Sequence, residues 1–249
     1  RTIFFILVIS IYLIITYKRA VFRSFYNSGI PGLIGGFVLS FGFCGYVFAM
    51  YNTTVANANF IIQTQTIFLA IFGYFFLKEK ISVITLTSII LAISGIFLMI
   101  GNSLSAGQLS GNIAALLMPI SFATLILVVR KYPNVDMVPA QFIAGVFALI
   151  IGFLMSETII ISINDIFLGF LAGFFQIGLG FIFITIGARR TPAAMVGIIM
   201  LTEAVLGPMW AWIFINEQPP FIVLIGGSIV LFAVLLQFYN LNQSEKISK

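Results

Sequence analysis

The sequence predicts an all-α polytopic membrane protein with nine transmembrane helices visible of an expected ten, built as two inverted five-helix repeats whose first helix is missing. Three observations support this prediction: the composition, the placement of the basic residues, and a match of the chain to itself. Hydrophobic residues make up 61% of the 249 residues and charged residues 8%, and the mean hydropathy is +1.18. A chain this apolar cannot cover a soluble core with polar surface, so it is expected to lie in a membrane.

Apolar runs suited to crossing the hydrocarbon recur along the whole chain, and a crossing helix takes roughly 20 residues. We expect nine such helices, over residues 2–17, 32–51, 58–77, 82–100, 112–129, 137–155, 166–187, 193–215 and 221–239. The connections between them are short and contain Gly, Pro, Asn and Ser. They leave no room for a soluble domain.

The Lys and Arg residues predict the orientation, because basic residues near helix ends favour the cytoplasmic side. Strict alternation of the nine helices puts eleven of the twelve basic residues on one side, and the connections on the other side contain none. We therefore expect an integral protein of the plasma membrane, the inner membrane in a bacterium, with its C-terminus in the cytoplasm.

The chain matches itself when shifted by 138 positions, so that residues 33–100 align without a gap on residues 171–238. Glu79 in the segment KEK then aligns with Glu217 in the segment NEQ. This match predicts a first repeat over 1–100, a second over 109–240 and a cytoplasmic tail over 241–249. The counterpart of helix 112–129 would precede Arg1, so a first helix is expected to be missing; a true nine-helix protein is the alternative. An odd number of helices per repeat inverts the second repeat.

Two segments resemble paired helix endings of a known family, because in each an apolar run closes on a glutamate: IFLAIFGYFFLKEKIS at 67–82 and LTEAVLGPMWAWIFINEQPP at 201–220. The chain is similar to the EamA-type transporters of the drug/metabolite transporter superfamily. The resemblance implies ten helices in two inverted repeats, a central cavity between them, and export of amino acids or other small metabolites. The chain departs from that pattern by lacking the first helix.

Glu203 stands near the middle of helix 193–215, whereas the other charged residues lie at helix ends. An acidic side chain at the bilayer centre costs roughly 2.5–3.5 kcal/mol on insertion scales. Two interpretations stay open. Glu203 contacts a substrate amine or takes up a proton, or it is a neutral acid bonded to a neighbouring helix or to the carbonyl that Pro208 leaves free.

The repeat partner of Glu203 is the neutral Gln65, in an unusually polar helix where the spacing places Asn59, Gln63 and Thr66 on one face. Trp210, seven residues after Glu203, could stack on a substrate. Single amides such as Gln176 and Gln141 are more often structural, and Glu79 and Glu217 precede helix starts, where negative charge suits the helix dipole. The candidate substrate-binding residues are Glu203, Gln65, Asn59, Gln63, Thr66, Gln176 and Trp210.

The function expected from these features is secondary transport, with export of an amino acid or amine by alternating access and protons as a coupling ion. A lipophilic drug or lipid exporter and a non-transporting fragment are the alternatives. With no histidine and one cysteine, the chain has no catalytic or metal-binding constellation, so neither enzyme activity nor a metal or other cofactor is expected. The expected partners are a small-molecule substrate, protons, the lipid bilayer and a second copy in a homodimer, but no nucleic acid.

Overall fold

The computed structural model describes residues 1–53, 58, 61–100, 109–156, 162–203, 205–206, 209, 213 and 221–247. The regular elements in these ranges are all helical. They fall into two compact units, one made of Arg1–Val47 and Ile120–Thr191, the other of Phe48–Pro119 and Pro192–Lys249. Each unit therefore combines residues from both predicted repeats. Asn59, Pro208, Trp210 and Glu217 lie outside the described residues.

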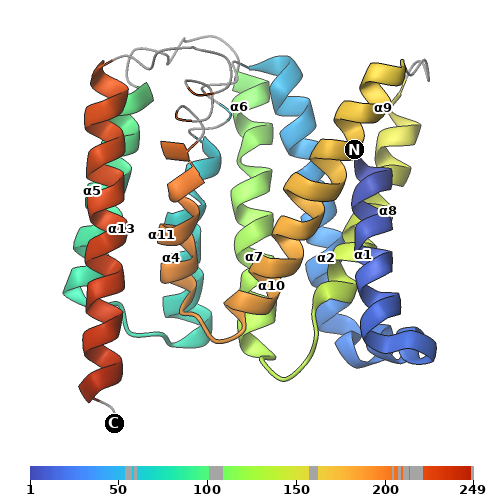
Figure 1. Cartoon of the computed structure of the whole chain (residues 1–249), viewed down its shortest axis with the longest axis horizontal. Coiled ribbons are helices and arrows are strands. Elements are labelled where there is room, and N and C mark those ends of the chain that lie inside the picture. Colours follow the sequence, from blue (N-terminus) through green and yellow to red (C-terminus); the bar gives the residue numbers. More distant parts are fainter. Residues whose placement is uncertain are drawn as a thin grey trace. The chain divides into compact units, whose positions relative to one another are not determined.

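The first unit is built from six whole elements and from parts of α2 and α7 (Figure 1). They are α1 (Thr2–Tyr17), η1 (Lys18–Ala20), α2 (Val21–Asn52) up to Val47, α7 (Leu117–Lys131) from Ile120, α8 (Val138–Leu154), α9 (Ile163–Phe170), η2 (Leu171–Leu179) and α10 (Gly180–Ala188). The predicted helix 166–187 is thus three consecutive helices, of which η2 is a π-helix. The predicted helix 32–51 begins earlier, at Val21, and is kinked at Gly29.

The core of the first unit is an aromatic cluster around Phe181. Its ring makes edge-to-face contacts with Phe5, Phe43 and Phe122 at centroid distances of 6.1, 5.4 and 5.9 Å. These pairs join four helices, α10, α1, α2 and α7, and edge-to-face geometry is the one that aromatic quadrupoles favour. The cluster fixes the mutual packing of the helices that carry the polar network described below.

Small residues allow the helices of the first unit to approach closely. A Cβ on Gly36 of α2 would lie 2.3 Å from the carbonyl oxygen of Ala140 in α8. A Cβ on Gly178 of η2 would lie 2.0 Å from Cγ1 of Val8 in α1. Only glycine fits such contacts, and small residues at helix interfaces are the usual solution in membranes, where lipid supplies no hydrophobic drive for association.

The second unit contains α4 (Gln65–Leu77), α5 (Val83–Ile100), α6 (Leu109–Ala115), α11 (Ala193–Met200) and α13 (Phe221–Ile247). Helix α13 runs beyond the predicted end at residue 239. Two clusters of buried side chains hold these helices together. One joins α4, α5, α11 and α13 through Ala70, Ile89, Ala194, Ile198 and Val234, and the other contains Ala92, Ile96, Leu201, Val230 and Ala233.

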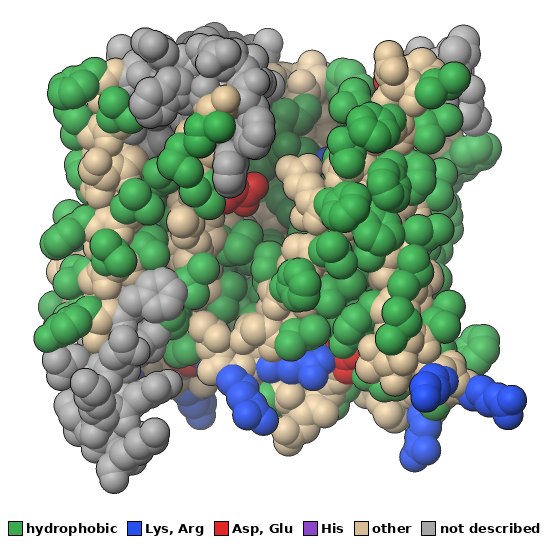
Figure 2. All heavy atoms as spheres, viewed as in Figure 1, with side chains coloured by type: hydrophobic (Ala, Val, Ile, Leu, Met, Phe, Trp, Pro, Cys, Tyr) green, Lys and Arg blue, Asp and Glu red, His purple; other side chains and the backbone are tan. Residues whose placement is uncertain are grey.

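The outer surfaces of the helices are apolar, as expected for a chain in lipid. Figure 2 shows hydrophobic side chains along the flanks of the first unit and Lys and Arg side chains at one end of its helices. Among the described residues, Thr2–Asn52, Leu109–Lys131 and Ile163–Ala188 are long and apolar enough to cross a membrane, and four shorter apolar helices accompany them.

Candidate functional site

Two of the predicted polar residues, Gln65 and Thr66, begin α4 in the second unit, and Thr66 contacts α11. Thr66 is fully buried, and its Oγ1 donates a hydrogen bond of 3.1 Å to the carbonyl oxygen of Gly197. A Cβ on Gly197 would lie 2.8 Å from Cα of Thr66, so the two backbones touch at this point. Gln65 is 3% exposed. Thr66 therefore belongs to the packed interface between the two helices, whereas Gln65 is shown to be buried.

Glu79 lies at the other end of the same helix pair. Its Oε2 accepts a hydrogen bond of 2.9 Å from the backbone N–H of Ala193, the first residue of α11. Helix α5, which follows Glu79 in the chain, begins instead on Ser82, whose Oγ accepts from the N–H of Thr85. The prediction that Glu79 serves a helix start is therefore right in kind, but the helix is α11 rather than the next one.

Gly73 makes room for the Glu79 side chain, because a Cβ at this position would lie 2.9 Å from Oε2. The chain can turn back here because Lys78 has a positive φ of 55° after the last residue of α4. The N–H of Glu79 then donates to the carbonyl oxygen of Gly73 at 3.0 Å. The end of α4 is thus folded around the start of α11.

Glu203 has an exposed side chain in the described structure. It stands three residues beyond Met200, the last residue of α11, and inside the apolar run predicted over 193–215. The contacts of Gly73 with Ala193 and of Thr66 with Gly197 show that α4 and α11 are antiparallel. Glu203, beyond the end of α11, therefore lies toward the N-terminal end of α4, which Gln63 precedes in the chain.

Gln63 is half-buried, and its Oε1 is buried without a hydrogen-bond partner among the described residues. A buried amide oxygen without a partner costs free energy, so it is a position where a ligand or water can bind.

Gln176 belongs to the first unit, in the π-helix η2, and its side chain is exposed. In η2 the hydrogen-bond period of five residues brings Gly173 and Gly178 near one face, where they contact α1. Gln176 lies between them in sequence and points away from that contact. Short π-helical segments are frequent at functional sites, which is consistent with a role for this amide.

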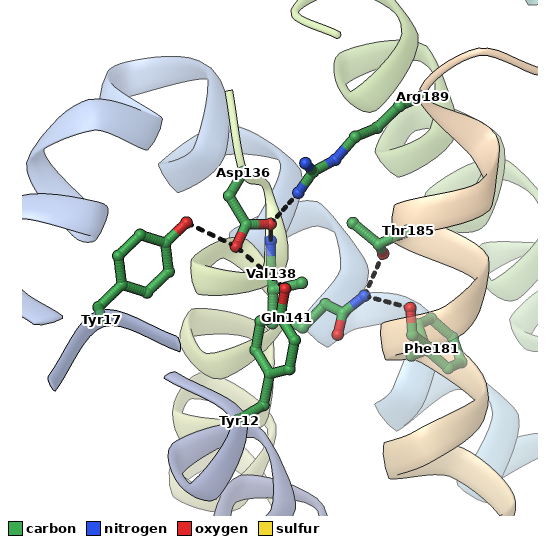
Figure 3. A network of polar contacts seen from close by, with 8 residues as sticks. All are labelled: Tyr12, Tyr17, Asp136, Val138, Gln141, Phe181, Thr185 and Arg189. Carbon is green, nitrogen blue, oxygen red and sulfur yellow. Dashed lines mark hydrogen bonds and ion pairs between the residues drawn. The ribbon is translucent and has the colours of Figure 1, made fainter. Parts of the chain in front are cut away.

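A polar network that the sequence analysis did not single out joins the ends of three helices of the first unit (Figure 3). Its centre is Asp136, in the loop between α7 and α8, which pairs with the guanidinium group of Arg189 just after α10. The hydroxyl of Tyr17 at the end of α1 donates to Asp136 Oδ2 at 2.8 Å. The N–H of Val138, at the start of α8, donates to Oδ1 at 3.1 Å.

Two further contacts extend this network. The hydroxyl of Tyr12 lies 3.5 Å from Asp136 Oδ2, and the guanidinium group of Arg130 donates to the carbonyl oxygen of Arg189 at 3.1 Å. The sequence alone could have pointed to Asp136, because it is an acidic residue in a connection that also contains Arg130 and Lys131. The tyrosines that contact it are 119 and 124 residues away, so only the fold brings them there.

Gln141 on α8 is fully buried below this network. Its Nε2 donates to the carbonyl oxygen of Phe181 at 2.7 Å and also to the hydroxyl of Thr185 (Figure 3). Both acceptors lie on α10, so Gln141 joins α8 to α10. The structural interpretation expected for this amide fits these contacts.

An open pocket of about 290 Å³ adjoins the network in the first unit. It is lined by Tyr17, Ser24, Asn27, Asn134, Val135 and Asp136. None of these residues was predicted to bind substrate. The pocket lies at the end of the helices where the basic residues gather.

Comparison with known proteins identifies the family. A model of the EamA-like transporter family matches residues 1–101 and 109–239. The chain belongs to the EamA-like transporter family. This is a family of membrane transporters and not of enzymes. The predicted resemblance to EamA-type transporters is confirmed.

Two relatives of the EamA-like chain are named uncharacterized transporters. One, from Methanothermobacter thermautotrophicus, is 28% identical over 207 residues, which cover 76% of this chain and 58% of the relative. The other, from Clostridium kluyveri, is 25% identical over 234 residues, which cover 88% of this chain and 73% of the relative. The chain thus spans less than two thirds of the Methanothermobacter protein.

The fold of the EamA-like chain is also found in a solved crystal structure. That structure has a TM-score of 0.76 and 14% sequence identity, and the match covers 94% of this chain and 86% of the other. At this identity the similarity establishes the fold alone.

Proposed function

We propose that this EamA-like transporter exports a small amino acid or amine by alternating access, and that Glu203 contacts the ammonium group of the substrate. The observation that carries the proposal is the exposure of the Glu203 side chain within the apolar run of residues 193–215. Contact with lipid would cost this carboxyl group roughly 2.5–3.5 kcal/mol. Contact with a water-filled substrate pathway removes most of that cost.

The surroundings of Glu203 support a substrate with both charged and hydrogen-bonding groups. The unpartnered Oε1 of Gln63 lies toward the same end of the α4 and α11 pair and can accept a hydrogen bond from such a substrate. The predicted helices contain no Lys or Arg in their interiors. A phosphate-bearing cargo is therefore disfavoured, because phosphate recognition relies on basic side chains.

Glu203 can act in either of two ways, by binding the substrate or by carrying a proton, and the two ways predict different results. If it only binds the ammonium group, its removal weakens substrate binding and every transport mode. If it carries a coupling proton, its removal abolishes transport driven by a pH gradient but leaves exchange of substrate across the membrane intact. Asn59 and Trp210 are proposed to line the same pathway from their positions in the sequence. Gln176, in the first unit, is proposed as a further substrate-binding residue.

The test is transport of labelled amino acids and amines into proteoliposomes that contain the wild-type chain, Glu203→Gln or Glu245→Gln. Glu245→Gln is the matched control, because it removes the same charge outside the apolar runs. We expect Glu203→Gln to lose at least tenfold in transport, about 1.4 kcal/mol of interaction, with unchanged expression. Full activity of Glu203→Gln would overturn the proposal, and export of apolar compounds alone would favour a lipophilic cargo instead.

A further inference from the structure

The segment between α1 and the long straight part of α2 is a separate short helix. Helix α1 ends where Lys18 takes a φ of 48°, a left-handed conformation that is uncommon for a residue with a side chain. Gly29 has a φ of 54° and breaks α2 after Ser28. Val21–Ser28 therefore forms one helical segment between two breaks. Figure 1 shows this part of the chain, in blue, lying across the end of the first unit rather than along α1.

One side of this short helix is anchored to its own unit. Ser24 and Ser28 are buried, and their hydroxyls donate to the carbonyl oxygens of Val21 and Phe25 within the segment. The ring of Phe25 packs edge to face on Phe142 of α8 at 5.4 Å. The side chains on this side of the segment are uncharged, and they pack against the first unit.

The opposite side of the helix is both aromatic and basic. Phe22 is 88% exposed and Tyr26 is 86% exposed, and four residues separate them, so they share one face. Arg19 and Arg23 are exposed with the same spacing. Among the described residues, no acid forms an ion pair with either arginine or with Lys18. Within the part of the chain that the structure describes, three positive charges thus have no acidic partner, and two large rings are largely exposed.

We propose that residues 18–28 form an interfacial helix that binds anionic phospholipid head groups, with Phe22 and Tyr26 inserted among the acyl chains. A short helix with aromatic and basic residues on its exposed face is the usual form of an amphipathic membrane-surface segment. The partner is lipid rather than protein because the segment lies between the apolar helix α1 and the rest of α2, within the stretch Thr2–Asn52 that is long and apolar enough to cross a membrane. We therefore expect its exposed face at the bilayer edge. Each basic residue near an anionic surface strengthens binding about fivefold.

The test uses the full chain in nanodiscs of phosphatidylcholine with or without phosphatidylglycerol, and it measures hydrogen exchange of the backbone amides of residues 18–28. We expect phosphatidylglycerol to slow exchange, and added salt to weaken this protection, because screening acts on exposed charges. In Arg19→Gln/Arg23→Gln, the lipid dependence should fall by about 25-fold. The matched control is Lys78→Gln/Lys80→Gln, which removes two exposed basic residues from the second unit and should keep the protection.

Two more variants test the same proposal if Arg19→Gln/Arg23→Gln folds poorly. Arg19→Lys/Arg23→Lys keeps both charges and should retain the lipid dependence, whereas Phe22→Ser/Tyr26→Ser should lose protection in both lipids. The proposal would be overturned if the wild-type chain exchanged at the same rate with and without phosphatidylglycerol. It would also be overturned if Arg19→Gln/Arg23→Gln and Lys78→Gln/Lys80→Gln lost the lipid dependence to the same extent. Full protection by soluble glycerol phosphate in phosphatidylcholine alone would overturn it as well, because the basic residues would then bind a free phosphate.

Discussion

Asp136 and Arg189 form an ion pair that joins the loop between α7 and α8 to the end of α10. The side chain of Asp136 is 9% exposed and that of Arg189 is 24% exposed, so water screens this pair less than a surface pair. Tyr17 and the N–H of Val138 complete the hydrogen bonds of the carboxylate. The pair is therefore the centre of a network that holds three helix ends together.

Breaking this ion pair should destabilise the first unit. We expect Asp136→Asn to lower the free energy of unfolding by about 1–3 kcal/mol, because Arg189 loses a charged partner while it remains partly buried. Thermal unfolding of the detergent-purified chain measures the change. In the double variant Asp136→Asn/Arg189→Gln, the loss should be smaller than the sum of the two single losses. Arg190→Gln, at an exposed neighbouring position, is the control and should have little effect.

Additive losses in that double-mutant cycle would show that the two side chains do not interact. A loss of transport without a loss of stability would have a different meaning. It would show that the network acts in the transport cycle rather than in folding.

Gly197→Ala should separate α4 from α11. The added methyl group would lie 2.8 Å from Cα of Thr66, a backbone atom that cannot move alone. We expect a loss of roughly 1–3 kcal/mol in unfolding free energy, typical of overpacking. Gly187→Ala is the matched control, because a Cβ there meets no atom within 4 Å. Equal thermal stability of the two variants would contradict the close approach at Gly197.

Substitution of Glu79 should destabilise the start of α11. Glu79→Ala removes the acceptor of the Ala193 N–H and should cost about 0.5–2 kcal/mol, as for other N-terminal caps. Glu79→Gln keeps an oxygen acceptor but loses the charge that favours a helix N-terminus, so its cost should be smaller, about 0.3–1 kcal/mol. Hydrogen exchange of the first turn of α11 measures both. If these variants instead speed exchange in the first turn of α5, then Glu79 caps α5 rather than α11.

Exchanging the two repeat-related side chains should not preserve transport. Gln65 is 3% exposed whereas Glu203 is exposed, so a carboxyl group moved to position 65 would be buried. We expect Gln65→Glu to lower stability, because burial of a charged group without a partner is costly. Gln65→Glu/Glu203→Gln should transport no better than Glu203→Gln alone. Recovery of transport in the double variant would show that the two positions are equivalent.

The sequence by itself determined the class of the molecule and most helix positions, because a helix in lipid must satisfy its own backbone and show an apolar surface. The limits of α1 and α8 agree with the predicted ranges to within a residue. The family was also accessible, since the segments that end at Glu79 and Glu217 are local features. The prediction of two inverted repeats stays a prediction.

Only the tertiary structure decided which helix each polar side chain serves. Glu79 binds the first N–H of a helix 114 residues away, and Asp136 binds tyrosines from α1. Gln65 is buried and Glu203 is exposed, although the repeat places them at equivalent positions in the sequence. Such contacts depend on the packing of distant helices through glycines and aromatic rings, and an apolar run in the sequence does not specify which neighbour it will meet.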